Sequence, residues 1–205
     1  MRYIKVLSIM ACCLALASPS AFCAGVINGD FEAGTLDPWG MTGAGTGYAI
    51  STVAPHSGNY CALATKAEGG LGGLVQNFAL AGGVEIKASF WYKALGTQWT
   101  WGGGSYGESS LVEMDAGGNQ IKHNYLALLG LNFPAPTADW TLVTQTIVTD
   151  PATVSAQIYM NAQVAQGDQL FLDDYSVVPT APVPEPAGLA VLACGILPLI
   201  ARRRR

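Results

Sequence analysis

The chain has 205 residues, 50% of them hydrophobic and 12% charged, and a formal net charge of −4 at pH 7. Six of its ten Lys and Arg lie near the two ends, so residues 24–183 keep four Lys against 13 of the 14 Asp and Glu, a net charge of 4 − 13 = −9. Nucleic acid binding depends on basic contacts to phosphate. An acidic body therefore argues against nucleic acid as a partner, and it is compatible with bound calcium or neutral sugars.

Residues 1–23 have the pattern of a secretory signal peptide. Arg2 and Lys5 precede an apolar run, and residues 21–23 satisfy a small-x-small cleavage rule that places the cut before Ala24. We therefore expect export through the Sec translocon. A lipoprotein is the alternative, because the peptide ends in cysteine, but the bulky phenylalanine before that cysteine disfavours it.

Residues 24–178 are predicted to form one all-β domain. Short β-rich runs are separated by Gly, Pro, Asn and Asp, which is typical of strands joined by turns. In several runs apolar and polar residues alternate, as they do in a half-buried strand. The clearest runs are residues 74–80, 84–93, 109–115, 121–129, 140–148, 153–161 and 169–178. Seven or more short strands predict a β-sandwich or jelly roll.

A glycine-rich segment over residues 96–108 is the candidate ligand surface. Trp99 and Trp101 are two residues apart, so on a strand both indoles would point to the same face. Exposed indoles stack on the C–H faces of sugars, while nearby polar groups bond the hydroxyls. The alternative is that one or both tryptophans fill the core, as Trp39 and Trp140 are expected to do. The candidate sugar-binding residues are Trp99, Trp101, Tyr106, Gln98 and Glu108.

No catalytic set is recognisable, so we expect a protein that is not an enzyme. The chain lacks a His-Glu-x-x-His motif, and its one Gly-x-Ser-x-Gly pattern, at residues 103–107, lies in a glycine-rich run that no predicted helix follows, so it is not a nucleophile elbow. Asp173 and Asp174 are adjacent, so a regular strand would send them to opposite faces, and they would not form the facing carboxylates of a glycosidase. Glu113 and Asp115 share a face, but alternating acids on a strand are commonly exposed and not catalytic.

Residues 179–205 form a tail in two parts. Residues 179–186 are a proline-rich linker that contains Pro184-Glu185-Pro186, and residues 187–205 are an apolar run closed by Arg202, Arg203, Arg204 and Arg205. As a helix, the apolar run of residues 187–201 would span about 22 Å, short of the ~30 Å hydrocarbon core of a bilayer. Snorkelling of the arginines would make up part of this difference. We therefore expect a C-terminal hydrophobic anchor helix.

This tail resembles the PEP-CTERM sorting signal of Gram-negative bacteria that make exopolysaccharide. The resemblance covers residues 183–205, with the Pro-Glu-Pro motif, the apolar segment and the terminal arginines in that order. It implies that an exosortase-type membrane peptidase is a partner and that the protein is anchored in the membrane only until it is processed. A plain tail anchor is the alternative.

The body resembles jelly-roll carbohydrate-binding modules of the xylan- and glucan-binding kind. Five segments carry the resemblance, in order over residues 26–178: Asn28-Gly29-Asp30-Phe31-Glu32 followed by Trp39, the Ser-Gly turn and strand of residues 56–63, residues 88–94, the Trp-opened strand of residues 140–143, and residues 171–177.

The same resemblance implies a structural calcium where the first strand, the Ser-Gly turn and the last strand meet. The matching positions are Asp30, Glu32, Ser57, Tyr60 and Asp173. Calcium binds several oxygens, including carboxylates and carbonyls of adjustable loops. The alternative is that Glu32 and Asp173 cap turns or face water.

Together these features predict an exported, PEP-CTERM-sorted, non-catalytic protein of the cell surface or extracellular matrix of a Gram-negative bacterium. Its expected ligand is a polysaccharide. The alternative is a structural or adhesive matrix protein with protein partners, for which the sandwich is only a scaffold.

Overall fold

The computed structural model describes residues 25–66, 70–99, 104–130 and 137–180. The predicted signal peptide, the Pro-Glu-Pro motif, the anchor helix and Trp101 lie outside these residues. Within the described ranges every regular element is a strand. The same part of the chain contains no helix long and apolar enough to cross a membrane.

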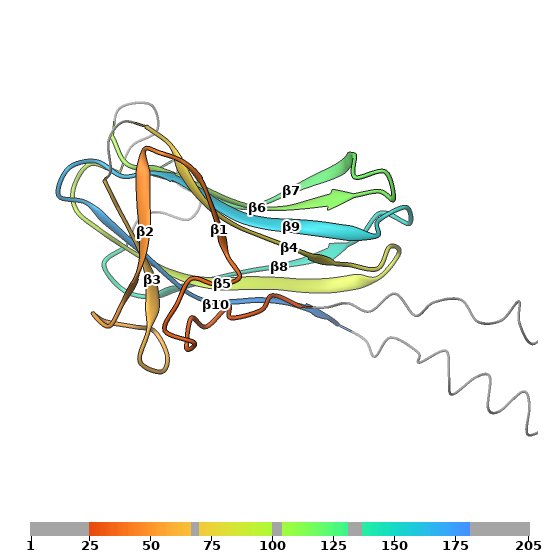
Figure 1. Cartoon of the computed structure of the whole chain (residues 1–205), viewed down its shortest axis with the longest axis horizontal. Coiled ribbons are helices and arrows are strands. Elements are labelled where there is room, and N and C mark those ends of the chain that lie inside the picture. The colour runs from red at the N-terminus through yellow and green to blue at the C-terminus, as the bar shows by residue number, and fades with distance from the viewer. Residues whose placement is uncertain (1–24, 67–69, 100–103, 131–136, 181–205) are drawn as a thin grey trace, which may run out of the picture. The chain divides into compact units, whose positions relative to one another are not determined.

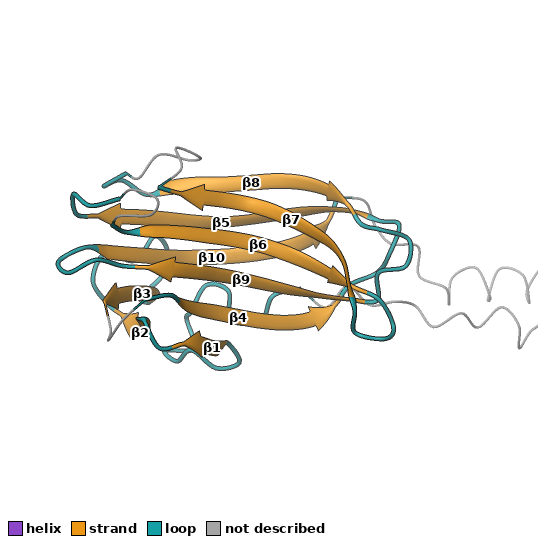
Figure 2. Cartoon of the chain, turned by 90° about the horizontal axis from the view of Figure 1, so that it is seen from above, coloured by secondary structure: helices purple, strands orange, loops and turns teal. Residues whose placement is uncertain are grey.

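Ten strands form two five-stranded antiparallel sheets that pack face to face (Figures 1 and 2). In spatial order, the first sheet consists of β1 (Gly40–Gly43), β4 (Gly72–Ala79), β9 (Ser155–Gln163), β6 (Tyr106–Met114) and β7 (Gln120–Leu129). The second sheet consists of β2 (Thr46–Ser51), β3 (Cys61–Lys66), β10 (Gln169–Pro179), β5 (Glu85–Leu95) and β8 (Thr141–Val148). This all-β sandwich confirms the predicted fold class for the body of the chain.

The core lies between the two sheets and follows from the alternation of side chains along each strand. On β5, Phe90 and Tyr92 are fully buried, so Trp91 between them points away from the core. On β9, Ile158 and Met160 are buried in the same way. Burying one such side chain stabilises the fold by about 1.5–3 kcal/mol, so the two-residue period fixes which face of each strand turns inward.

Each of the seven predicted runs overlaps one strand, with bounds that differ by up to three residues, whereas β1 and β2 were not predicted. These two strands have the sequences GMTG and TGYAIS. They contain much glycine and threonine and little apolar alternation, and their place at one edge of each sheet depends on pairing with β4 and β3. The strand β3 was expected only from the resemblance to carbohydrate-binding modules.

A β-bulge in β10 changes the last strand. Its pairing with β5 shifts register between Asp173 and Ser176, and Asp174 has a φ of 51°. This is the left-handed region, which a non-glycine residue adopts rarely. The expectation that Asp173 and Asp174 point to opposite faces is therefore wrong, because the bulge turns both carboxylates toward the same turn at residues 56–57.

Candidate functional site

In the predicted ligand surface at residues 96–108, Trp99 is buried, whereas Gln98, Tyr106 and Glu108 are not, and Trp101 lies outside the described residues. Trp99 is 9% exposed and belongs to the hydrophobic core, and its Nε1 donates to the carbonyl oxygen of Leu95 at 3.2 Å. The alternative of core packing therefore holds for Trp99, whose indole is not offered to a ligand. Gln98 is exposed, and its Nε2 donates to the carbonyl oxygen of Gln166 at 3.4 Å.

A buried carboxylate explains why the chain turns inward at Trp99. Asp168 is 4% exposed and accepts hydrogen bonds from the backbone N–H groups of Thr97 and Gln98, at 3.2 and 3.3 Å. It also accepts a bond of 2.6 Å from Ser105 Oγ on the far side of the loop. One side chain thus holds both ends of the glycine-rich loop. This contact joins residues about 70 positions apart, and no local pattern indicated it.

The other two predicted sugar-binding residues, Tyr106 and Glu108, lie on β6 and face away from the core. Ser109 faces inward, since its Oγ is 3.4 Å from the buried Tyr175 hydroxyl, so its neighbour Glu108 faces outward. The register places Glu108 beside Asn161 of β9. We call this side of the first sheet the outer face. On β6, β7 and β9 its side chains include Tyr106, Glu108, Ser110, His123, Tyr125, Tyr159, Asn161 and Gln163.

Hydrogen bonds on the outer face converge on one carboxylate oxygen. Glu108 Oε1 accepts from the Tyr159 hydroxyl at 2.6 Å and from Ser110 Oγ at 3.1 Å, and His123 Nε2 lies 3.4 Å away. His123 Nε2 is also 3.0 Å from the Tyr159 oxygen. Because the tyrosine proton is donated to Glu108, the imidazole must carry a hydrogen on Nε2 to donate to that oxygen.

The tyrosine in this network stays protonated at neutral pH. Burial is the largest cause that raises the pKa of Tyr159, and the neighbouring Glu108 carboxylate adds to it, although Ser110 opposes the shift. The Tyr159 hydroxyl is therefore a permanent donor to Glu108. The second carboxylate oxygen, Oε2, accepts no hydrogen bond from the described residues, and the Glu108 side chain is 24% exposed.

Two aromatic rings stand beside this carboxylate. The imidazole of His123 stacks on the ring of Tyr125, with centroids 4.3 Å apart and planes 21° from parallel. Tyr159 meets His123 edge-on at 6.0 Å. Tyr125 is 50% exposed, so an aromatic ring is open to solvent next to a fixed acceptor. Sequence reasoning did not bring His123 together with Tyr125, two positions away on β7, or with Tyr159 on β9.

Small residues let the polar row continue across β4. A β-carbon at Gly73 would collide with the side chains of Asn161 and Thr42, so only glycine allows these two polar groups to approach over this position. Beside them, Gln157 Nε2 donates to Asn77 Oδ1 at 3.0 Å. The outer face therefore presents amide and hydroxyl groups on either side of the aromatic pair.

The predicted calcium ligands meet around a different feature, the turn at residues 56–60. Glu32 Oε1 accepts from the backbone N–H groups of Asn59 and Tyr60, both at 2.8 Å. Asp173 Oδ2 accepts from the backbone N–H groups of His56 at 2.9 Å and Ser57 at 3.3 Å. The two carboxylates thus tie the beginning and the end of the domain to one turn, and both cap that turn, as the alternative to a calcium site expected.

The chemistry of these groups partly fits a cation. Asp173 is fully buried. Burial is the largest cause that raises the pKa of Asp173 to about 6, and the charge of the adjacent Asp174 adds to this rise. No Lys or Arg among the described residues forms an ion pair with it. On the other hand, the backbone N–H groups of Asn59 and Tyr60 lower the pKa of Glu32, and the described ranges hold no group of three or more His, Cys, Asp or Glu suited to a metal.

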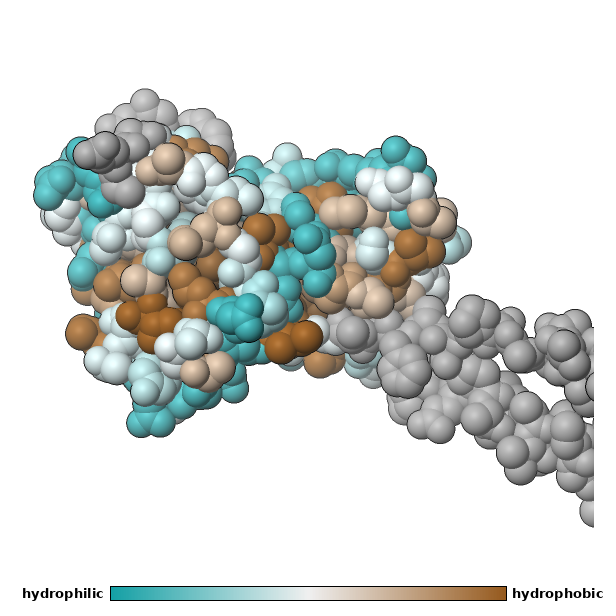
Figure 3. Space-filling view, in the orientation of Figure 1, coloured by the Kyte–Doolittle hydropathy of each residue, from teal (hydrophilic) through white to brown (hydrophobic). Residues whose placement is uncertain are grey.

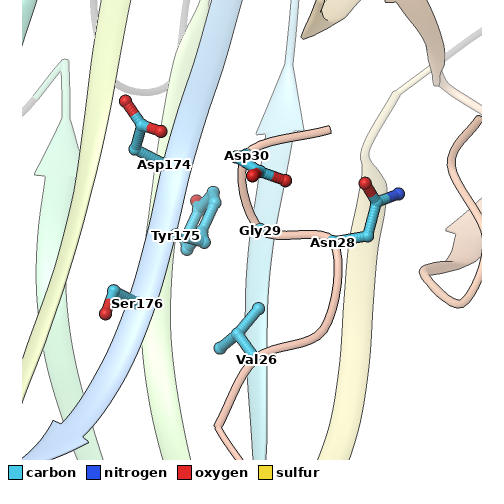
Figure 4. A pocket seen from close by; sticks show the side chains of 7 residues that line it. All are labelled: Val26, Asn28, Gly29, Asp30, Asp174, Tyr175 and Ser176. Carbon is cyan, nitrogen blue, oxygen red and sulfur yellow. The ribbon is translucent and has the colours of Figure 1, made fainter. Parts of the chain in front are cut away.

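Asp30, the remaining predicted ligand, lies a short distance along the chain. Its Oδ1 accepts from the Glu32 backbone N–H at 3.3 Å. Asp30 and Asp174 line a surface pocket where the N-terminal segment crosses β10, together with the side chains labelled in Figure 4. The backbone of this segment bonds β10 directly, because Tyr175 N–H donates to the Gly29 carbonyl oxygen at 2.8 Å.

A second aromatic group lies on the outward side of the second sheet. His56 stacks on Trp91 with centroids 3.9 Å apart and meets Trp140 edge-on at 5.6 Å. Trp140 Nε1 donates to the Ala54 carbonyl oxygen at 3.1 Å. Trp140 is half-buried and lies outside the core cluster, so the expectation that it lies in the core is wrong: it covers the 54–56 loop. Trp39, by contrast, is 6% exposed and lies in the core as expected.

Of the two acids at the end of β6, Glu113 differs from the expectation of exposed acids. Glu113 is fully buried and accepts bonds of 2.7 Å from Thr153 Oγ1 and from the Asp150 backbone N–H, and 2.8 Å from Asn124 Nδ2. Asp115 caps the following turn through the N–H groups of residues 117 and 119. Glu113 satisfies buried donors, so its role is structural.

The family of the chain follows from comparison of its sequence with known families. The family model CBM_4_9, described as a carbohydrate binding domain, matches residues 24–169. The chain belongs to this family. The match confirms the resemblance to carbohydrate-binding modules on which the fold was expected. No curated protein matches the sequence significantly.

Solved carbohydrate-binding modules have the same fold. A family 16 carbohydrate-binding module is 18% identical at a TM-score of 0.56, with 75% of this chain and 98% of that one covered. The module TmCBM61, solved in complex with β-1,4-galactotriose, is 21% identical at a TM-score of 0.52, with 75% and 97% covered.

Two larger enzymes contain a similar region. The CBM22-1 and GH10 modules of Clostridium thermocellum xylanase 10B, solved with xylohexaose, are 18% identical at a TM-score of 0.57, with 78% of this chain covered. The enzymatically active domain of tailspike protein 4 of bacteriophage CBA120 is 14% identical at a TM-score of 0.61, with 75% of this chain covered. The chain spans 29% of the xylanase modules and 21% of the tailspike domain.

Proposed function

We propose that this carbohydrate-binding module is a non-catalytic, exported protein that binds polysaccharide through the outer face of the first sheet. The observation that carries the proposal is the exposed Tyr125 ring, stacked on His123 beside the fixed Glu108 carboxylate. A sugar ring would lay its C–H face on Tyr125, and its hydroxyl groups would donate to Glu108 Oε2 and bond the amide of Asn161. Contact of the sugar ring with the flat face of Tyr125 would supply affinity, and the polar groups would orient the sugar.

A binding role fits this face better than catalysis. A glycosidase of the usual kind needs two carboxyl groups about 5–9.5 Å apart across the scissile bond. Among the described residues of the outer face, Glu108 is the only carboxylate. Its Oε1 is held by the Tyr159 hydroxyl, which is the arrangement of a fixed acceptor.

The first test is affinity electrophoresis and calorimetry of residues 24–183 on xylan, β-glucans and the exopolysaccharide of the producing bacterium. Replacement of Tyr125 by Ala should weaken retention about two- to tenfold, since stacking of a ring on an aromatic side chain is worth about 0.5–1.5 kcal/mol. The matched control is Leu142→Ala, which truncates a side chain 43% exposed on the second sheet and should leave retention unchanged. Failure to bind any of these polysaccharides would refute the proposal.

The proposal extends to the route of the protein. The resemblance of residues 183–205 to a PEP-CTERM signal supports cleavage by an exosortase-type peptidase and display on the surface or in the matrix of a Gram-negative bacterium. Mass spectrometry of the protein recovered from the producer tests this. We expect a chain that begins at Ala24 and ends close to Pro184-Glu185-Pro186, and a chain that retains Arg205 would contradict it.

The proposal also includes a calcium ion at the turn of residues 56–60. Glu32 and Asp173 would supply carboxylate oxygens there, with backbone oxygens completing the set, and the ion would hold the two ends of the domain together. The supporting observation is the fully buried Asp173 carboxyl with its raised pKa. Calcium should raise the melting temperature of residues 24–183 relative to a chelator, and this rise should vanish in Asp173→Asn.

A structural or adhesive role with protein partners remains the second candidate. It is favoured by exposed apolar side chains away from the outer face, such as Met41 and Val53, which are 63% and 65% exposed. In Figure 3 hydrophobic residues form several separate groups among hydrophilic ones on the side shown. Retention of other matrix proteins on the immobilised domain, with no retention of any polysaccharide, would favour this role.

A further inference from the structure

The outer face carries one carboxylate that no Lys or Arg among the described residues pairs with, and this bears on the kind of glycan that the face accepts. Glu108 is the carboxylate beside the aromatic pair. Its three neighbours, Tyr159, Ser110 and His123, all approach Oε1. Oε2 has no partner among the described residues, so it is the oxygen that remains for a ligand.

No lysine among the described residues reaches this carboxylate, and its one basic neighbour is the His123 imidazole, whose Nε2 lies 3.4 Å from Oε1. The body has four lysines and no arginine. Lys66, Lys87 and Lys93 are on strands of the second sheet. Lys122 is on β7, but its Nζ donates to the Val148 carbonyl oxygen at 2.6 Å and lies 3.6 Å from the buried Glu113. The residues outside the described ranges between positions 25 and 180 add one acid, Glu68, and no base.

The environment of Glu108 keeps its charge in place for a ligand. Neutral hydroxyl groups of Tyr159 and Ser110 fix the carboxylate without cancelling its charge. The side chain is 24% exposed, so its field is less screened than that of a fully exposed group. The whole body adds a net charge of 4 − 13 = −9 of the same sign, which repels polyanions at longer range.

We propose that the outer face selects glycans by charge, with Glu108 Oε2 as the acceptor for a protonated amino group on the sugar. Glycans that carry amino groups bind more tightly than the neutral polymer, and glycans that carry carboxylates bind more weakly. This inference rests on the proposed function of the outer face and adds the chemical class of the ligand. Tyr159 acts as a positioning residue, since its hydroxyl orients the Glu108 carboxylate.

The test uses three β-1,4-glucan chains of equal length that carry a hydroxyl, a primary amine or a carboxylate at C6. At neutral pH a primary alkyl amine is protonated, as in lysine, and calorimetry gives the three dissociation constants on residues 24–183. One charge pair at a partly exposed site is worth about 1 kcal/mol, so the amine should bind about three- to tenfold tighter than the hydroxyl. The carboxylate should bind weaker by a similar factor, and added salt should shrink both differences.

Two variants separate a local effect from net charge. Glu108→Gln keeps an acceptor for Tyr159 and Ser110 but removes the charge, so the three chains should bind within about twofold of one another. Asp139→Asn removes an exposed charge from the loop before β8 and should preserve the order amine, hydroxyl, carboxylate. Equal binding of all three chains by the unaltered protein would overturn the inference while leaving the proposed function standing. Failure to bind any of the three would overturn it too, and the polysaccharide panel above decides the proposed function separately.

Discussion

Replacement of Asp173 by Asn should change how the stability of the domain depends on pH. Asp173 is fully buried, and burial is the largest cause that raises its pKa from 3.8 to about 6. Repulsion from the Asp174 carboxylate also raises this pKa, whereas hydrogen bonds from the N–H groups of Ser57, His56 and Asp174 lower it. Between these two pH values the folded protein keeps a proton on Asp173 that the unfolded chain has lost. Folding then binds a proton, so the stability contributed by this group is present at low pH and falls as pH rises through about 4 to 6.

The size of this fall follows from the shift. A change from 3.8 to about 6 is roughly two pKa units, and at about 1.4 kcal/mol for each unit the loss is at most about 3 kcal/mol. A typical domain has about 5–15 kcal/mol of stability, so the loss is a large part of the total. Bound calcium would remove it, because the ion favours the charged carboxylate.

Urea unfolding with a chelator, from about pH 4 to 7, measures the free energy of unfolding of both proteins. The unaltered protein should lose about 1–3 kcal/mol across this range relative to Asp173→Asn. Asparagine offers one acceptor atom where Asp173 uses both oxygens, for the turn and for the Asp174 N–H, so the variant should carry a constant offset of about 1 kcal/mol. Asp139→Asn, an exposed change, serves as the control. Parallel profiles for the unaltered protein and Asp173→Asn would refute the reasoning.

Three further substitutions follow from single contacts. Asp168→Asn leaves the backbone N–H groups of the loop near Thr97 poorly bonded, so it should lower the free energy of unfolding by about 1–3 kcal/mol. The Trp fluorescence spectrum should shift to longer wavelength as Trp99 becomes exposed. Glu113→Ala leaves buried donors without a partner and should lower the free energy of unfolding by about 1–3 kcal/mol, measured in urea. Ile158→Ala opens a cavity in the core and should cost about 2–5 kcal/mol, measured by thermal melting, whereas Val178→Ala on the surface should cost little.

The fold could be predicted wherever the local period of the sequence was strong. On β5 the alternation of Phe90 and Tyr92 with their neighbours predicted the strand, and the structure shows that these two side chains face the core. The bulge at Asp174 could not be read from the chain, because it depends on the register between β10 and β5. The same limit applied to β1 and β2, whose sequences carry little apolar alternation.

The candidate site was predicted less well, and for a definite physical reason. Composition drew attention to the tryptophans of the glycine-rich loop, but Trp99 is turned into the core by Asp168, which is distant in sequence. Glu108 was named among the polar candidates, yet its partners Tyr159 and His123 come from neighbouring strands. A face built from single residues of three strands has no linear motif, so only strand pairing brings it together.

The two proposed functional features, the sugar-binding face and the calcium site, involve different sheets, and this separates their effects. Glu108, Tyr125 and Tyr159 belong to β6, β7 and β9 of the first sheet, whereas Asp173 belongs to β10 of the second. Removal of calcium should therefore act on polysaccharide binding only through the fraction of protein that remains folded. Well below the melting temperature a chelator should leave the dissociation constant for a neutral polysaccharide unchanged while it lowers the melting temperature. A change in that dissociation constant while the domain stays folded would mean that the turn at residues 56–60 is coupled to the outer face across the core.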